Sequence, residues 1–160
     1  MRARYIVIFL ISFVISSCDL LQNKAKMNNI NDTFYSDLGG LDRPRIPLIK
    51  PYELLKISDS EWHLELQNPG LLVLSIHNVK GVCIHDSLIA IYSKGEVEFQ
   101  NKLHEKAWFI IEPRRGLEKA FENELTFNDA YSKSKNGQKI HFYSPDSLYK
   151  SFEEQRKIVW

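Results

Sequence analysis

The sequence predicts the α+β class: a single small domain with a mainly antiparallel sheet of about five or six strands and one or two helices late in the chain. Two observations predict it. The middle of the chain alternates apolar and polar residues with a period of two, which is typical of half-buried strands. The last third carries helix-capping residues and apolar residues four positions apart. A hydrophobic content of 44% with 26% charged residues is ordinary for a globular domain.

The first strands are expected between residues 44 and 79. Pro44, Pro47 and Pro51 each lack a backbone donor, so this part is expected to be extended, with an edge strand near 52–57. The stretch SEWHLELQ predicts a half-buried strand, because apolar Trp62, Leu64 and Leu66 alternate with polar Glu61, His63 and Glu65. The nearly all-apolar run at 71–79 predicts a central strand covered on both faces.

Turn residues divide the following part of the chain. Lys80-Gly81 favours a bulge, His85-Asp86-Ser87 a hairpin turn, and the residues 93–96 a further turn. The run AWFIIEP, residues 107–113, is the most strand-like in the chain because it is aromatic and β-branched. Its final proline, Pro113, is expected to end the strand.

Two helices are expected in the last third. The stretch 125–137 places two aromatic residues one turn apart and ends in Asn-Gly, which fits a C-terminal stop. The stretch 144–157 begins with Ser144, a good N-cap, and Pro145, which suits the first helical position. The terminal Trp160 is expected to be held by packing, since a bulky apolar end is unfavourable in water.

The start of the chain carries an export signal. Arg2 and Arg4 precede an apolar run at 5–15, and small residues follow before Cys18 and Asp19. A basic start, a short apolar stretch and a small-residue exit are the parts of a secretory signal peptide. As a helix, the run 5–15 would reach about 16 Å, against about 30 Å of bilayer hydrocarbon, so a membrane span is not expected.

The exit Ile15-Ser16-Ser17-Cys18 resembles the lipobox of bacterial lipoproteins, in which an aliphatic residue and two small residues precede a cysteine. The resemblance implies that residues 1–17 are a removed signal peptide and that the Cys18 thiol carries the lipid. It also implies a location in the cell envelope, on the outer face of the inner membrane or on the outer membrane, with the membrane itself as partner. Two or more acyl chains hold a protein stably, whereas one does so only marginally.

Two alternatives stay open for this segment: an ordinary secretory signal with a chance cysteine, and a buried first element of a cytosolic protein.

The body of the chain also resembles small bacterial lipoproteins in its WFIIEP strand and its terminal tryptophan. That second resemblance implies no activity.

The remaining chain divides into two parts. The polar residues 18–33 are interpreted as a flexible tether reaching about 20 Å, with a short helix as the alternative, and residues 34–160 as the single α+β domain. Removing 1–17 leaves 19 Lys and Arg, two fewer than the 21 of the full chain, against 20 Asp and Glu. The side-chain balance therefore moves from +1 to −1, and a nucleic-acid partner, which requires a clearly basic domain, is not predicted.

Few residues point to chemistry. Once Cys18 is lipidated, Cys83 has no disulfide partner, and we interpret it as a small buried hydrophobe, with a reactive or metal-binding thiol as the alternative. His77, Cys83 and His85 have ligand-type side chains, but no fourth ligand is local, so neither a metal nor another cofactor is predicted. Ser75 and His77 would point the same way on a strand, yet that spacing alone is no evidence of a catalytic triad.

Two basic stretches have a functional and a plain interpretation. Arg114 and Arg115 follow the 107–113 strand and could bind a carboxylate or phosphate, but a solvated turn with surface ion pairs is the commoner meaning. Lysines at 133, 135 and 139 could face anionic lipid headgroups or simply stabilise a helix end.

No catalytic residue is therefore predicted. The composition and the anchor favour a non-catalytic binding or accessory protein of the bacterial cell envelope. An inhibitor or immunity-type protein that neutralises a toxin or hydrolase at the membrane is the alternative, and a small envelope enzyme is the third hypothesis.

Overall fold

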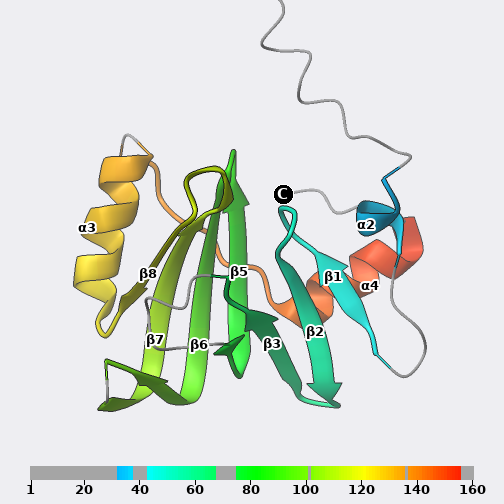
Figure 1. The fold of residues 1–160 in the computed structure, drawn as a ribbon, viewed down its shortest axis with the longest axis horizontal. Helices are drawn as coiled ribbons and strands as arrows, with labels where there is room; N and C mark the ends of the chain where they lie inside the picture. The colour runs from blue at the N-terminus through cyan, green and yellow to red at the C-terminus, as the bar shows by residue number, and fades with distance from the viewer. Residues whose placement is uncertain (1–31, 38–42, 68–74, 101, 136, 156–160) are drawn as a thin grey trace, which may run out of the picture. The chain divides into compact units, whose positions relative to one another are not determined.

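The computed structural model describes residues 32–37, 43–67, 75–100, 102–135 and 137–155, and they belong to one compact unit that begins at Asp32. It confirms the α+β class. The strands of the described part form two antiparallel sheets of four strands each, in the orders β1-β2-β3-β4 and β5-β6-β7-β8, instead of one sheet of five or six (Figure 1). The expected signal peptide, the expected lipidation site Cys18 and the terminal Trp160 lie outside the described residues.

The first sheet contains four short strands: β1 (Arg45–Pro47), β2 (Glu53–Ser58), β3 (Glu61–Glu65) and β4 (Ser75–Ile76). The edge position belongs to β1, where the missing donor of Pro47 is tolerated. The expected edge strand near 52–57 is instead β2, an interior strand between β1 and β3. The alternation in β3 is confirmed, since Trp62 and Leu64 are buried and Glu65 is exposed.

The second sheet contains longer strands: β5 (Val79–His85), β6 (Leu88–Phe99), β7 (Lys102–Glu112) and β8 (Leu117–Phe121). The hairpin turn before Leu88 is confirmed, with Asp86 at a φ of 56°. So is the bulge at Lys80-Gly81, where the register shifts. Pro113 ends β7 as expected and begins a 3₁₀ turn, Pro113–Arg115.

Two expectations in this region are wrong. No turn separates 93 from 96, because β6 continues through a register shift between Lys94 and Val97 in which Gly95 adopts a φ of 137°. The run 71–79 is also not one central strand. Its described part is split between β4, at the end of the first sheet, and β5, with Asn78 at a φ of 50° interrupting them. A positive φ at a residue other than glycine is not a strand conformation, and the hydrophobic periodicity of the sequence does not reveal it.

The core has two layers on opposite faces of the second sheet. Successive strand residues point to opposite faces. One face, with Ile89, Ile91 and Phe109, packs in a single cluster with Leu54 and Leu64 of the first sheet. The other face packs against helix α3, which contributes Phe127 and Tyr131 to this second layer of the core.

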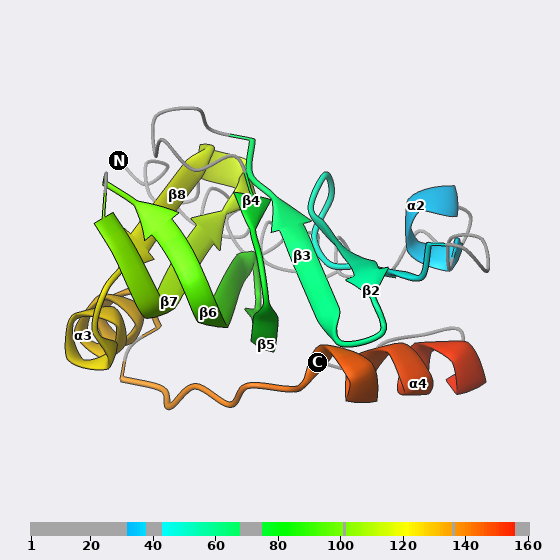
Figure 2. The same cartoon turned by 90° about the horizontal axis from the view of Figure 1, so that it is seen from below.

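The helices agree with the capping signals. Helix α3 (Glu124–Ser134) lies beside β7 and β8, and helix α4 (Pro145–Gln155) contacts β1 and β5 (Figures 1 and 2). Ser144 caps α4, since the Ser147 backbone N–H donates to its Oγ at 3.2 Å. A short helix, α2 (Thr33–Ser36), lies at the end of the segment that the sequence assigns to the tether.

Candidate functional site

The outward-pointing residues of the first sheet form its polar face. Because Trp62 and Leu64 point into the core, their neighbours in β3 point the other way. We call this surface the outer face, and it consists of Glu53, Leu55, Glu61, His63, Glu65, Ser75 and His77. It gathers two imidazoles, three carboxylates and a hydroxyl from β2, β3, β4 and the residue that follows β4.

Three of these side chains form a linear chain of polar atoms. The Oγ atom of Ser75 lies 2.8 Å from Nε2 of His77. On the other side of the same ring, Nδ1 of His77 lies 3.4 Å from Oε1 of Glu61. A carboxylate beside Nδ1 favours the tautomer that carries its proton there. In that tautomer Nε2 of His77 accepts a hydrogen bond from the Ser75 hydroxyl. A serine nucleophile, its histidine base and the carboxylate behind the base have the same order.

The second imidazole lies next to this chain. The His63 ring centre is 6.0 Å from that of His77, and its Nδ1 atom is buried without a hydrogen-bond partner among the described residues. Burial lowers the pKa of His63, His77 lowers it further, and Glu65 and Glu61 act in the opposite direction. The ring is therefore held towards its neutral form.

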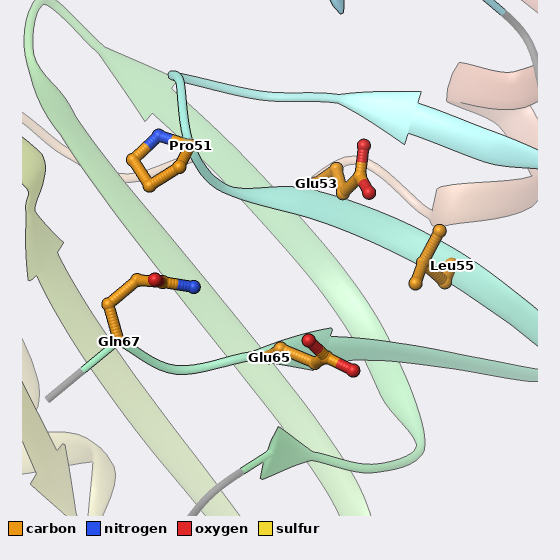
Figure 3. A pocket seen from close by; sticks show the side chains of 5 residues that line it. All are labelled: Pro51, Glu53, Leu55, Glu65 and Gln67. Atoms are coloured by element: carbon orange, nitrogen blue, oxygen red, sulfur yellow. The ribbon is translucent and has the colours of Figure 1, made fainter. Parts of the chain in front are cut away.

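A shallow depression of about 50 Å³ lies on the same face (Figure 3). Its lining comes from β2, β3 and the residues beside them: Pro51, Glu53, Leu55, Glu65 and Gln67. Glu53 forms a salt bridge with Arg45 from β1. Ligand pockets usually hold about 300–1,000 Å³, so this depression has room for water or a single small group.

A larger depression of about 240 Å³ lies between α3 and the second sheet. Its apolar floor includes Ile110, and its rim carries the charged residues Glu112, Lys119, Asp129 and Lys133. Lys133 lies 2.6 Å from Asp129, so part of this charge is internally neutralised.

A buried carboxylate links the two sheets. Glu118 of β8 is 4% exposed and accepts hydrogen bonds from the Tyr52 hydroxyl at 2.7 Å and the Gln67 backbone N–H at 2.8 Å. Burial, reinforced by the Glu118 carboxylate, raises the pKa of Tyr52. Sequence reasoning missed this group, because β8 carries no strong strand signal and Glu118 is one of many acids.

Cys83 and His85 lie elsewhere, on β5 near α3. Cys83 is buried, as expected, and burial raises the pKa of its thiol. Tyr131 lies beside it, with its hydroxyl 3.2 Å from Nδ1 of His85. His77 contacts a different set of side chains, and no group of three ligand-type side chains converges on one point in the described part of the chain.

The basic stretches form ion pairs with carboxylates. Arg115 contacts Glu112 at 3.0 Å, which confirms the interpretation of a solvated turn with surface ion pairs, and Lys135 contacts Asp86 at 3.3 Å. The Arg115 side chain is largely exposed, so its pair with Glu112 contributes at most about 1 kcal/mol. Arg114, on the same turn, has no ion pair among the described residues.

Two further findings bear on function. In the part of the chain that the structure describes, no helix has the length and apolar character needed to cross a membrane. Comparisons with models of known families, with curated proteins and with solved structures found no match to this chain.

Proposed function

We propose that this chain is a bacterial envelope lipoprotein, anchored through lipid on Cys18, whose domain acts by binding another molecule. The observation that carries the proposal is the order of segments at the start of the chain: two arginines, an apolar run and Ile15-Ser16-Ser17-Cys18. The anchor keeps the domain at a membrane surface, where it serves as a binding or accessory protein.

The small volumes of the surface depressions support a binding role over a catalytic one. The two depressions described above hold about 50 and 240 Å³, below the volume of a typical substrate pocket. Neither encloses a nucleophile paired with a base. The outer face instead offers polar groups on a rigid sheet, which suits contact with a partner surface.

The anchor is tested by Cys18→Ser in cells fed a radiolabelled or clickable fatty acid. We expect the variant to lose lipid labelling and to leave the membrane fraction, whereas Cys83→Ser, the matched control, retains both. Unchanged labelling and fractionation of Cys18→Ser would show that the lipobox interpretation is wrong.

The binding role is tested by crosslinking the lipidated protein in its own membrane and purifying it. Recovery of one reproducible partner at defined stoichiometry supports the proposal. A toxin or hydrolase as that partner, inhibited on binding, favours the inhibitor alternative. Absence of any partner across crosslinkers of different length contradicts the binding role.

The Ser75–His77–Glu61 chain favours a second candidate function, an acyl hydrolase. Its Ser75 Oγ would attack the carbonyl carbon of an ester and pass its proton to His77 Nε2, which would return it to the alcohol that leaves as the ester C–O bond breaks; water would then hydrolyse the acyl-serine. A fluorophosphonate probe tests this, because it labels activated serines. Labelling that disappears in Ser75→Ala and His77→Gln but persists in Ser87→Ala would favour the hydrolase. No labelling of the wild type removes it.

A further inference from the structure

We propose that α2 is a detachable strap, which docks the end of the tether on β1 and thereby sets how far the domain reaches from its anchor. The docking follows from contacts among the described residues, whereas the reach rests on the lipid anchor proposed above. Helix α2 belongs to the same compact unit as the two sheets and lies beside β1 (Figure 1).

Arg45 of β1 is the centre of this docking. Its guanidinium carbon lies 5.0 Å from the centre of the Phe34 ring, and its Nη2 donates a hydrogen bond to the Phe34 carbonyl oxygen at 3.2 Å. Its Nη1 lies 3.4 Å from Oδ2 of Asp37, the residue that follows α2. The same guanidinium pairs with Glu53 of β2, so the sheet fixes its position. One cation of the sheet therefore contacts the ring, the backbone and the end of the strap.

Lys50, in the turn between β1 and β2, provides a second set of contacts. Its Nζ lies 5.8 Å from the centre of the Phe34 ring, within the range of a cation–π interaction. The same Nζ lies 3.3 Å from Oδ2 of Asp32, whose side chain caps α2. Its backbone N–H donates to the Tyr35 hydroxyl at 3.3 Å. Every one of these contacts joins α2 or its cap to the body of the domain.

The docking is weak compared with the packing of the core. No residue of α2 is buried, and none of its four described residues belongs to either hydrophobic cluster. A helix of one turn is unstable by itself. Its attachment depends on ion pairs with exposed partners, which contribute little to stability and are screened by salt. Detachment of α2 therefore requires less free energy than unfolding of the sheets.

Detachment changes the length of chain that links Cys18 to the docked part of the protein. With α2 docked, the linking chain is residues 18–31. With α2 detached, it extends to residue 42, because Pro44 is held by the Lys56 backbone N–H. A fully extended chain spans about 3.5 Å per residue, so the greatest reach rises from about 50 Å to about 85 Å. The strap gives the anchored domain two ranges of distance from the membrane.

Amide hydrogen exchange of the full-length chain in detergent tests the strap. The reporters are the Tyr35 and Asp37 amides, whose hydrogen bonds to Asp32 and Thr33 form only in the docked turn. Relative to intrinsic rates, Phe34→Ala should speed their exchange at least about fivefold, because it removes both cation–π contacts. Alanine itself favours a helix, so lost helix propensity cannot cause this change. The matched control Ser36→Ala, at an exposed position of the same turn, should exchange like the wild type.

The wild type provides a measurement that needs no substitution. Raising the salt from about 0.05 M to about 0.5 M should speed exchange at the two reporters, because it screens the ion pairs of Lys50 and Arg45. The amides of β3 should not respond, and the urea midpoint of Phe34→Ala should equal that of the wild type. Unprotected reporters in the wild type, exchange that ignores both salt and Phe34→Ala, or a midpoint that falls in Phe34→Ala would overturn the strap.

The reach is measured on the lipidated protein in vesicles that contain a dansyl lipid. Energy transfer from the tryptophans to the dansyl groups should be lower for Phe34→Ala than for Ser36→Ala or the wild type. Equal transfer in all three proteins would overturn the change of reach. Failure of the wild type to stay on the vesicles would contradict the anchor, and the reach with it, whereas the exchange rates decide the docking of the strap in either case.

Discussion

At the scale of single residues, the described part of the chain places its least ordinary polar groups on the first sheet and at its contact with the second. Glu118 is a buried acid held by Tyr52 and by the Gln67 backbone. His63 is an imidazole with one buried nitrogen that lacks a partner among the described residues. The contacts of Glu118 are therefore sensitive to substitution, because a buried polar group that loses its partner keeps its desolvation cost.

Glu118→Gln should lower the free energy of unfolding by about 1.5–3 kcal/mol, since it replaces charge-assisted hydrogen bonds to Tyr52 and Gln67 by weaker neutral ones. Urea unfolding at neutral pH measures this. The exposed Glu122→Gln is the matched control and should stay within about 0.5 kcal/mol of the wild type. Equal midpoints for the two variants would contradict a role for the Glu118 contacts in stability.

His63 should make the protein less stable in mild acid. Its pKa is lowered in the folded state, mainly by burial, so the folded chain binds fewer protons at this position than the unfolded chain does. Stability therefore rises with pH, and it falls as the pH drops through the ordinary histidine pKa of about 6.5. Urea midpoints between pH 5 and 8 should show a smaller slope for His63→Gln than for the wild type or His141→Gln. A slope that His63→Gln leaves unchanged would assign the pH dependence to other groups.

At the scale of elements, local signals were sufficient where one residue type forces one geometry. Ser144 and Pro145 predicted the start of α4, Pro113 the end of β7, and the alternation around Trp62 the faces of β3. The signals failed where a strand continues through a glycine. Gly95 looks like part of a turn in the sequence, but in the structure it lies within a bulge, and the ladder resumes beyond it.

Gly95→Ala should destabilise the protein by about 1–3 kcal/mol, because a φ of 137° is strained for any residue with a Cβ. The added atom would also lie 2.8 Å from the side chain of Asn78. Gly116→Ala is the matched control: its φ is 58°, with no atom within 4 Å of the added Cβ, so about 1 kcal/mol is expected. The urea midpoint of Gly95→Ala should be lower than that of Gly116→Ala. The reverse order would contradict the strained backbone assigned to Gly95 in the bulge.

At the scale of the whole described unit, the two sheets share one hydrophobic cluster. Leu54 and Leu64 of the first sheet pack in the same cluster as Ile89 and Phe109 of the second. Trp62 further connects the first sheet to α4, since its Nε1–H donates to Asp146 at 2.9 Å. A shared core favours one cooperative transition over separate unfolding of each sheet.

Leu64→Ala tests this cooperativity. The side chain is fully buried, so its truncation should cost about 2–5 kcal/mol. Unfolding curves from far-ultraviolet circular dichroism and tryptophan fluorescence should stay superimposed while both shift to lower urea. Curves that separate in the variant would show that the sheets unfold independently.

The candidate site illustrates the limit of sequence reasoning. The spacing of Ser75 and His77 was no evidence for a nucleophile and base, because Glu61 joins these two residues only when β3 and β4 pair. The opposition of His63 and His77 was hidden for the same reason. The link from Glu118 to Tyr52 spans 66 positions and has no local signal.

The sequence by itself determined the α+β class, the N-terminal cap of α4, the burial of Cys83 and the lipobox resemblance of residues 15–18, because each depends on neighbouring residues. Only the tertiary structure decided that the eight strands of the described residues divide into two sheets and that Asn78 separates these sheets. It also decided which polar residues meet on the outer face. Those outcomes depend on strand register, which is set by pairing between segments far apart in the chain and not by the residues of either strand alone.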